Sequence, residues 1–119
     1  MRFFILRYSR GPNWTEGLPR LQQPMIGSHL AYLCGLHEKA QLVMAGPLEG
    51  AAGGIAIIQT TSAEDARAIA QADPGVLAGT LHVEVTEWRP IVWEHFSPAA
   101  IEFATGPVYV SYASSPAAG

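Results

Sequence analysis

The chain has 119 residues, of which 49% are hydrophobic and 14% charged, with a formal net charge of −3. This length suits one domain, and so apolar a composition favours a packed core over disorder. The basic residues are scattered from Arg2 to Arg89 without a cluster, which argues against nucleic-acid binding. The few charges also predict that part of the surface is buried in a homo-oligomer.

A single cysteine, Cys34, cannot build a disulfide framework and indicates a reducing compartment. The apolar run at the N-terminus is too short for a signal peptide and breaks at Arg7. No stretch approaches the ~20 apolar residues that cross a bilayer. We therefore expect a cytoplasmic protein that makes no contact with a membrane.

In chain order, the first predicted elements are a strand over residues 3–8 and a long loop over residues 9–24. Loops of this length without regular structure are uncommon, so we interpret this one as a candidate lid over a site. Apolar residues at three- and four-residue spacing then predict a helix over residues 28–39. Its buried stripe is predicted to consist of Leu30, Leu33, Cys34 and Leu36.

A second strand is predicted over residues 42–45 and a third over residues 55–60, joined by a glycine-rich hairpin loop. The second strand is expected to end in a turn at Gly46 and Pro47. These two residues either bring the backbone close to a ligand or simply terminate the strand. Glu49, in the loop, is interpreted as a solvated side chain rather than a second acid.

The second helix is predicted to begin at a capping box in which the Thr61 hydroxyl and the Glu64 carboxylate satisfy free amides. It is expected to end near Ala72, because Pro74 cannot continue a helix and forces Asp73 out of helical geometry.

The alternation of apolar and polar residues over residues 81–88 predicts a fourth strand. The order is typical of an α+β, ferredoxin-like βαββαβ fold, a four-stranded antiparallel sheet with two helices on one face. The strands at residues 3–8 and 55–60 are apolar on both sides, so the uncovered face predicts a sheet-on-sheet homodimer. We assign residues 1–93 to this domain and residues 94–119 to an extension with a short strand near residues 107–112.

The candidate catalytic residues are His29, near the start of the first helix, and Asp73, after the second. An imidazole can take up and return a proton near neutral pH, and a carboxylate on its other nitrogen would fix the tautomer. Tyr8 or backbone amides near Gly46 could bind a substrate oxygen, and Pro47 lies beside them. The alternative is a buried histidine bonded to a carbonyl and an aspartate that only caps a turn.

Other chemistry has little support in the sequence. His82-x-Glu84 places two potential ligands on one strand face, but no recognised metal-ligand spacing is present. No glycine-rich phosphate loop is present either. We therefore predict neither a metal nor a cofactor.

The chain resembles the YCII-related family, over roughly residues 29–93 and the first strand, in five short motifs: His29-Leu30-x-x-Leu33, Leu42-Val43-x-Ala45-Gly46-Pro47-Leu48, Ala72-Asp73-Pro74, Ala78-Gly79 and Trp88-Arg89-Pro90. The resemblance implies a dimeric α+β barrel with a site around His29 and Asp73. One branch of the family eliminates chloride from a chlorinated hydroxyquinone, and the wider superfamily includes muconolactone isomerases and small monooxygenases.

Two departures from the family pattern concern single residues. Gly75 replaces the aromatic residue that usually follows Asp-Pro, which predicts a larger or looser pocket wall. Ala40 stands where a glycine often ends the first helix, and a left-handed alanine costs about 1 kcal/mol.

The leading hypothesis is a small cofactor-free lyase or isomerase that uses His29 and Asp73 to abstract a proton from a small ring-derived substrate. The alternative is a non-catalytic dimeric module that binds a small ligand or a partner protein. A third option, a cofactor-free monooxygenase, rests on superfamily analogy alone.

Overall fold

The computed structural model describes residues 1–93. The chain divides into two compact units, Met1–Trp88 and Arg89–Gly119, and the helices and strands of the described residues all belong to the first. The predicted extension, with its short strand near residues 107–112, lies outside the described residues.

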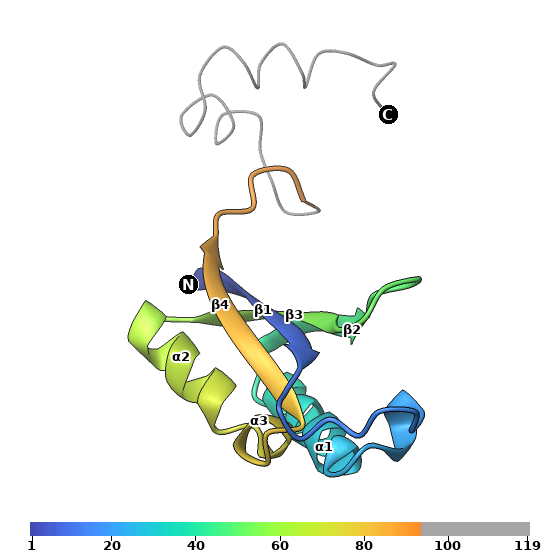
Figure 1. The fold of residues 1–119 in the computed structure, drawn as a ribbon. Coiled ribbons are helices and arrows are strands. Elements are labelled where there is room, and N and C mark those ends of the chain that lie inside the picture. The colour runs from blue at the N-terminus through green and yellow to red at the C-terminus, as the bar shows by residue number, and fades with distance from the viewer. Residues whose placement is uncertain (94–119) are drawn as a thin grey trace, which may run out of the picture. The chain divides into compact units, whose positions relative to one another are not determined.

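Four antiparallel strands form one sheet in the order β2-β3-β1-β4 (Figure 1). The strands are β1 (Arg2–Arg10), β2 (Leu42–Pro47), β3 (Gly54–Thr60) and β4 (Leu81–Trp88). The predicted ferredoxin-like α+β fold is confirmed. The two central strands, β1 and β3, are those that the sequence predicts to be apolar on both faces.

The helices lie together on one face of this sheet (Figure 1). They are the 3-10 turn η1 (Arg20–Gln22), α1 (Ile26–Glu38), α2 (Ala63–Gln71) and the short α3 (Pro74–Leu77). The short α3 is an additional element between the predicted second helix and fourth strand. It begins at Pro74, and proline is common at a first helical position. The buried core between sheet and helices is formed by Phe4, Leu6, Tyr8, Ile26, Leu33, Leu36, Ala56, Ile58, Ala66, Ala70, Leu81 and Val83.

The buried face of α1 differs from the predicted one. Its buried residues are Ile26, His29, Leu33 and Leu36. Leu30 and Cys34, which were expected in the stripe, are exposed. The packed stripe therefore includes His29 as a member rather than as an edge residue.

The helix ends show how local side chains set the boundaries. The N-cap of α2 is Ser62, whose hydroxyl accepts a hydrogen bond from the Asp65 amide at 3.0 Å, so the prediction of a box starting at Thr61 is wrong by one residue. Both residues carry a hydroxyl, so sequence alone does not choose between them. After α1, Ala40 adopts φ = 59°, the strained left-handed geometry that the sequence predicts.

Gly46 and Pro47 do not form the turn that ends β2. Both still pair with β3, opposite Ile55 and Gly54, and the turn follows them. A proline is tolerated here because β2 is an edge strand, where one side of the strand has no ladder to complete.

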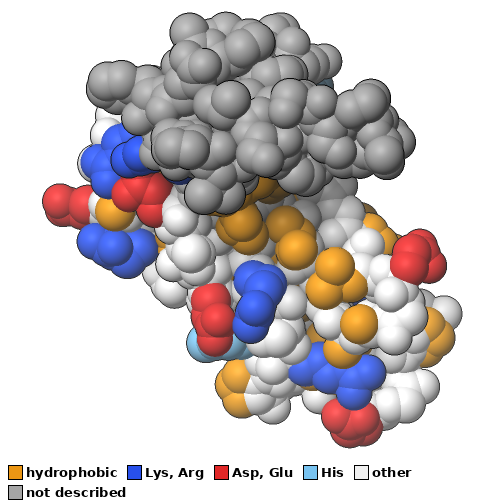
Figure 2. Space-filling model, turned by 90° about the horizontal axis from the view of Figure 1, so that it is seen from above, with side chains coloured by type: hydrophobic (Ala, Val, Ile, Leu, Met, Phe, Trp, Pro, Cys, Tyr) orange, Lys and Arg blue, Asp and Glu red, His pale blue; other side chains and the backbone are white. Residues whose placement is uncertain are grey.

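No helix of residues 1–88 covers the opposite face of the sheet (Figure 1). Hydrophobic side chains gather on this face beside a charged pair, as Figure 2 shows. Ile5, Ile55 and Ile57 are half-buried there, and Met44 is 63% exposed. The charged pair is Arg7 with Glu84, at 3.6 Å.

Candidate active site

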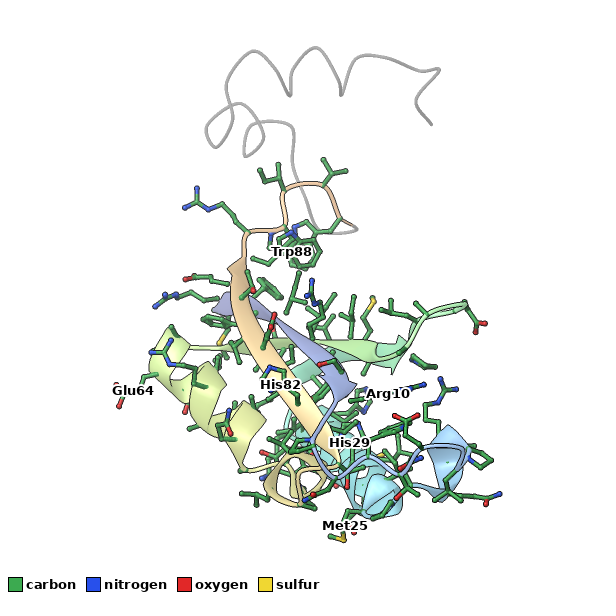
Figure 3. All side chains as sticks on the ribbon, viewed as in Figure 1. Arg10, Met25, His29, Glu64, His82 and Trp88 are labelled. Atoms are coloured by element: carbon green, nitrogen blue, oxygen red, sulfur yellow. The ribbon has the colours of Figure 1, made fainter. Side chains whose placement is uncertain are left out.

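His29 and Asp73 meet beneath the sheet, although 44 residues separate them in the chain. The His29 Nδ1 lies 2.6 Å from the Asp73 Oδ2, within range of a short, charge-assisted hydrogen bond. The Asp73 side chain is fully buried, and that of His29 is 10% exposed. Figure 3 shows His29 in the region where α1 meets the sheet. The predicted proximity of these two groups is present.

Asp73 is placed by the break between α2 and α3. It is the N-cap of α3 in extended geometry, and its Oδ1 accepts a hydrogen bond from the Gly75 amide at 2.8 Å. Its other oxygen therefore points back toward His29. The same carboxylate caps a helix and holds the imidazole, so both readings of this aspartate describe part of its role.

Gly75 lets α3 approach α1 closely. A Cβ at this position would lie 3.1 Å from the His29 Cβ and 3.1 Å from the Leu81 Cδ1. Gly75 is buried and does not line the cavity described next. The expectation that it loosens a pocket wall is wrong: glycine here gives tight packing behind the imidazole.

A cavity of about 810 Å³ opens in front of His29. This volume is in the range of small-molecule sites. The cavity is lined from β1, the loop after it, α1 and the end of β2, and its walls include His29, Leu30, Leu33, Trp14, Arg10, Arg20, Ala45, Gly46 and Pro47. Leu30 is thus a cavity residue rather than a core residue.

The hydrogen bond of the His29 ring to Asp73 uses Nδ1. The other ring nitrogen, Nε2, makes no hydrogen bond with residues 1–93. The carboxylate favours the tautomer that carries its proton on Nδ1. The remaining nitrogen is then a free acceptor on a residue that lines the cavity. The arrangement can accept a proton from a bound molecule.

Tyr8 stands beside the imidazole. Its ring meets that of His29 edge to face, with centroids 5.0 Å apart. Its hydroxyl is buried and makes no hydrogen bond with the described residues. Burial raises the pKa of this hydroxyl, and the nearby Asp73 carboxylate raises it further. Tyr8 therefore keeps its proton and remains a hydrogen-bond donor.

Gly46 and Pro47 both line the cavity, from the end of β2. Glu49 is exposed and outside the lining, in keeping with a solvated side chain. The predicted site residues Tyr8, Gly46 and Pro47 are thus brought around the same cavity as His29.

Gln23 is a structural residue of this site that the sequence analysis missed. Its buried side chain accepts from the Thr15 amide at 2.8 Å and donates to the Thr15 and Leu18 carbonyls at 2.8 and 2.7 Å. These bonds close the loop after β1 into a shaped wall of the cavity. No residue spacing predicts them, because every partner of Gln23 is a backbone group.

Within residues 1–93, no group of three or more His, Cys, Asp or Glu side chains is arranged to hold a metal ion. His82 and Glu84 lie 3.8 Å apart on the exposed sheet face, away from the cavity residues. None of the helices in this part of the chain has both the length and the apolar character needed to span a bilayer.

The comparisons with known proteins agree with this architecture. The YCII-related domain matches residues 1–89. The uncharacterized protein YjpA of Bacillus subtilis (strain 168) is 33% identical over 75 residues, which are 63% of this chain and 88% of that protein.

A solved structure shares the fold. It is 5-chloro-2-hydroxyhydroquinone dehydrochlorinase (TftG) from Burkholderia phenoliruptrix AC1100, in complex with 2,5-dihydroxybenzoquinone. It matches with a TM-score of 0.55 and 23% identity, over 80% of this chain and 99% of that one. With the family match over most of its length, the chain belongs to the YCII-related family.

Proposed function

We propose that this protein is a small enzyme that moves a proton on a ring-derived substrate without a cofactor. The observation that carries the proposal is His29, a residue of the cavity wall whose Nδ1 is bonded to a buried carboxylate while its Nε2 makes no hydrogen bond with the described residues. The fold shared with a dehydrochlorinase that binds a hydroxyquinone supports a substrate of similar size.

In the proposed reaction, the His29 Nε2 takes a proton from a substrate C–H next to a carbonyl, and the bonding electrons form an enolate. Asp73 stabilises the imidazolium that results. Backbone amides near Gly46, at the end of β2 on the cavity wall, donate to the enolate oxygen. The proton returns to another carbon in an isomerisation. In an elimination, the enolate expels a leaving group with its electron pair, and His29 releases the proton to solvent.

This proposal is tested by following substrate protons in D₂O. We expect catalysed loss of C–H signals from butenolide ring acids by proton NMR, or chloride release from 5-chloro-2-hydroxyhydroquinone. The matched reaction without protein gives the background rate. Binding of these compounds without exchange or release would contradict the proposal and favour the non-catalytic binding module.

We also propose that the protein assembles as a homodimer through the helix-free face of the sheet. Half-buried isoleucines and the exposed Met44 make this face apolar. Arg7 and Glu84 lie on it as a pair of opposite charge, so a two-fold copy would face it with complementary charges. A second sheet of the same shape would remove these apolar side chains from water.

The dimer is tested with Ile57→Glu, which places a carboxylate on the half-buried apolar face. An unpaired charge buried at an interface costs about 3–5 kcal/mol, so we expect a monomer by light scattering at micromolar concentration. The matched control is Ala68→Glu, at an exposed position of α2, which should remain dimeric. A wild-type protein that is monomeric in the same measurement would refute the assembly.

A further inference from the structure

Two guanidinium groups line the cavity that holds His29. Arg10 is the last residue of β1, and Arg20 begins η1 on the loop wall. Glu16 is the carboxylate that lines the same cavity. The cavity side chains therefore carry a cationic excess, in a protein whose formal net charge is −3.

Arg10 is held in place without using its hydrogen-bond donors. Its guanidinium carbon lies 5.4 Å from the centre of the Trp14 ring, a cation–π contact. Its Nη1 lies 3.6 Å from the Glu16 Oε2, which is too long for a hydrogen bond. By contrast, Arg2 is engaged by Glu87 through two hydrogen bonds of 2.8 and 2.7 Å. The donors of Arg10 are thus oriented but unoccupied within the described residues.

The position of Arg10 relative to the dyad follows from strand geometry. Arg10 and Tyr8 are two residues apart on β1, so their side chains leave the same face of the sheet, about 6.8 Å apart along the strand. Tyr8 in turn contacts His29. Arg10 and His29 also lie on the same side of the sheet in Figure 3. Arg10 and His29 line the same cavity, so one small ring-derived molecule bound there can contact both.

We propose that Arg10 determines substrate specificity by binding an anionic oxygen pair on the substrate ring, best supplied by a carboxylate. The planar fork of the guanidinium matches two carboxylate oxygens, and the Trp14 face preorganises it. Arg20 adds positive charge at the same cavity, and Glu16 competes with the ligand for Arg10. This inference rests on the proposed function for the role of His29 as the reacting group. The predicted binding of an anion by Arg10 does not depend on that role.

The probes are benzoate and benzamide, which have the same shape and differ in charge, titrated against the full chain by NMR. We expect benzoate to bind at least about tenfold more tightly than benzamide, since hydrogen bonds between charged groups have roughly that effect. Arg10→Gln should remove the difference and leave benzamide binding unchanged. The control Arg67→Gln, at an exposed position of α2 away from the cavity, should leave both affinities unchanged.

A second variant is expected to strengthen benzoate binding rather than weaken it. Glu16→Gln removes the competing carboxylate, so benzoate should bind more tightly, with no change for benzamide. Titration of 2,5-dihydroxybenzoquinone distinguishes the source of the anion: weaker binding than benzoate supports the carboxylate. Equal binding of benzoate and benzamide, or tighter binding of the hydroxyquinone than of benzoate, would overturn the proposal.

These measurements need no turnover, so they separate the two proposals. Loss of benzoate selectivity in Arg10→Gln with no proton exchange on any ring acid would refute the proposed reaction and retain the anion site. Proton exchange that is equally fast on acids and on their amides would refute the anion site and retain the proposed reaction.

Discussion

Replacing His29 with asparagine is expected to slow proton exchange by about 10³- to 10⁴-fold, the upper part of the range for losing a general base. The asparagine amide can still donate to Asp73, as the His29 Nδ1 does over 2.6 Å, but it cannot take up a proton. The unfolding temperature should therefore change little. The rate is measured by loss of the substrate C–H signal in D₂O.

The control for this variant is His37→Asn, on the same helix but exposed to solvent. It should exchange at the wild-type rate. A His29→Asn protein with wild-type exchange would show that another group takes the proton, and the proposed chemistry would fail.

Asp73→Asn is expected to slow the reaction by a similar factor, for a different reason. The amide oxygen can still accept from the Gly75 amide, which leaves the NH₂ group facing Nδ1. The imidazole must then carry its proton on Nε2, where it cannot act as a base. The double variant His29→Asn/Asp73→Asn should be no slower than either single variant, because both changes remove the same base.

The single variant Asp73→Asn should also lower the free energy of unfolding by about 1–3 kcal/mol, because a buried charge-assisted hydrogen bond is lost. Urea unfolding measures this loss. Asp65→Asn is the matched control: Asp65 also accepts a side-chain hydrogen bond, from Thr60 beside the N-cap of α2, but it does not line the cavity. It should lose stability and keep its rate. A slow Asp65→Asn protein would mean that stability, not tautomer control, sets activity.

The parts of the fold that were predicted correctly are those with a strong local signal. The alternation over Leu81–Thr86 identified β4, and Pro74 fixed the point at which Asp73 leaves helical geometry. Leu30 was misplaced because a cavity wall and a core are both apolar, so hydrophobicity does not separate them. Gln23 was missed because backbone partners leave no pattern in the side chains.

The sequence identifies His29 and Asp73 as candidate residues, but local pattern does not show that they are in contact. Their closeness depends on α3 lying against α1, and that packing depends on Gly75, which the sequence suggested as a loose wall. Tertiary contact, not local propensity, decides such a position.

The two contacts of the Asp73 carboxylate bear on how sequences of this family should be compared with one another. Its carboxylate both caps α3 and holds the imidazole, so we expect the stability of the fold to retain this aspartate in relatives whether or not they are enzymes. The imidazole of His29, by contrast, makes no hydrogen bond to the backbone of the described residues. Under the proposed chemistry, we expect substitutions at His29, rather than at Asp73, to distinguish catalytic relatives from non-catalytic ones.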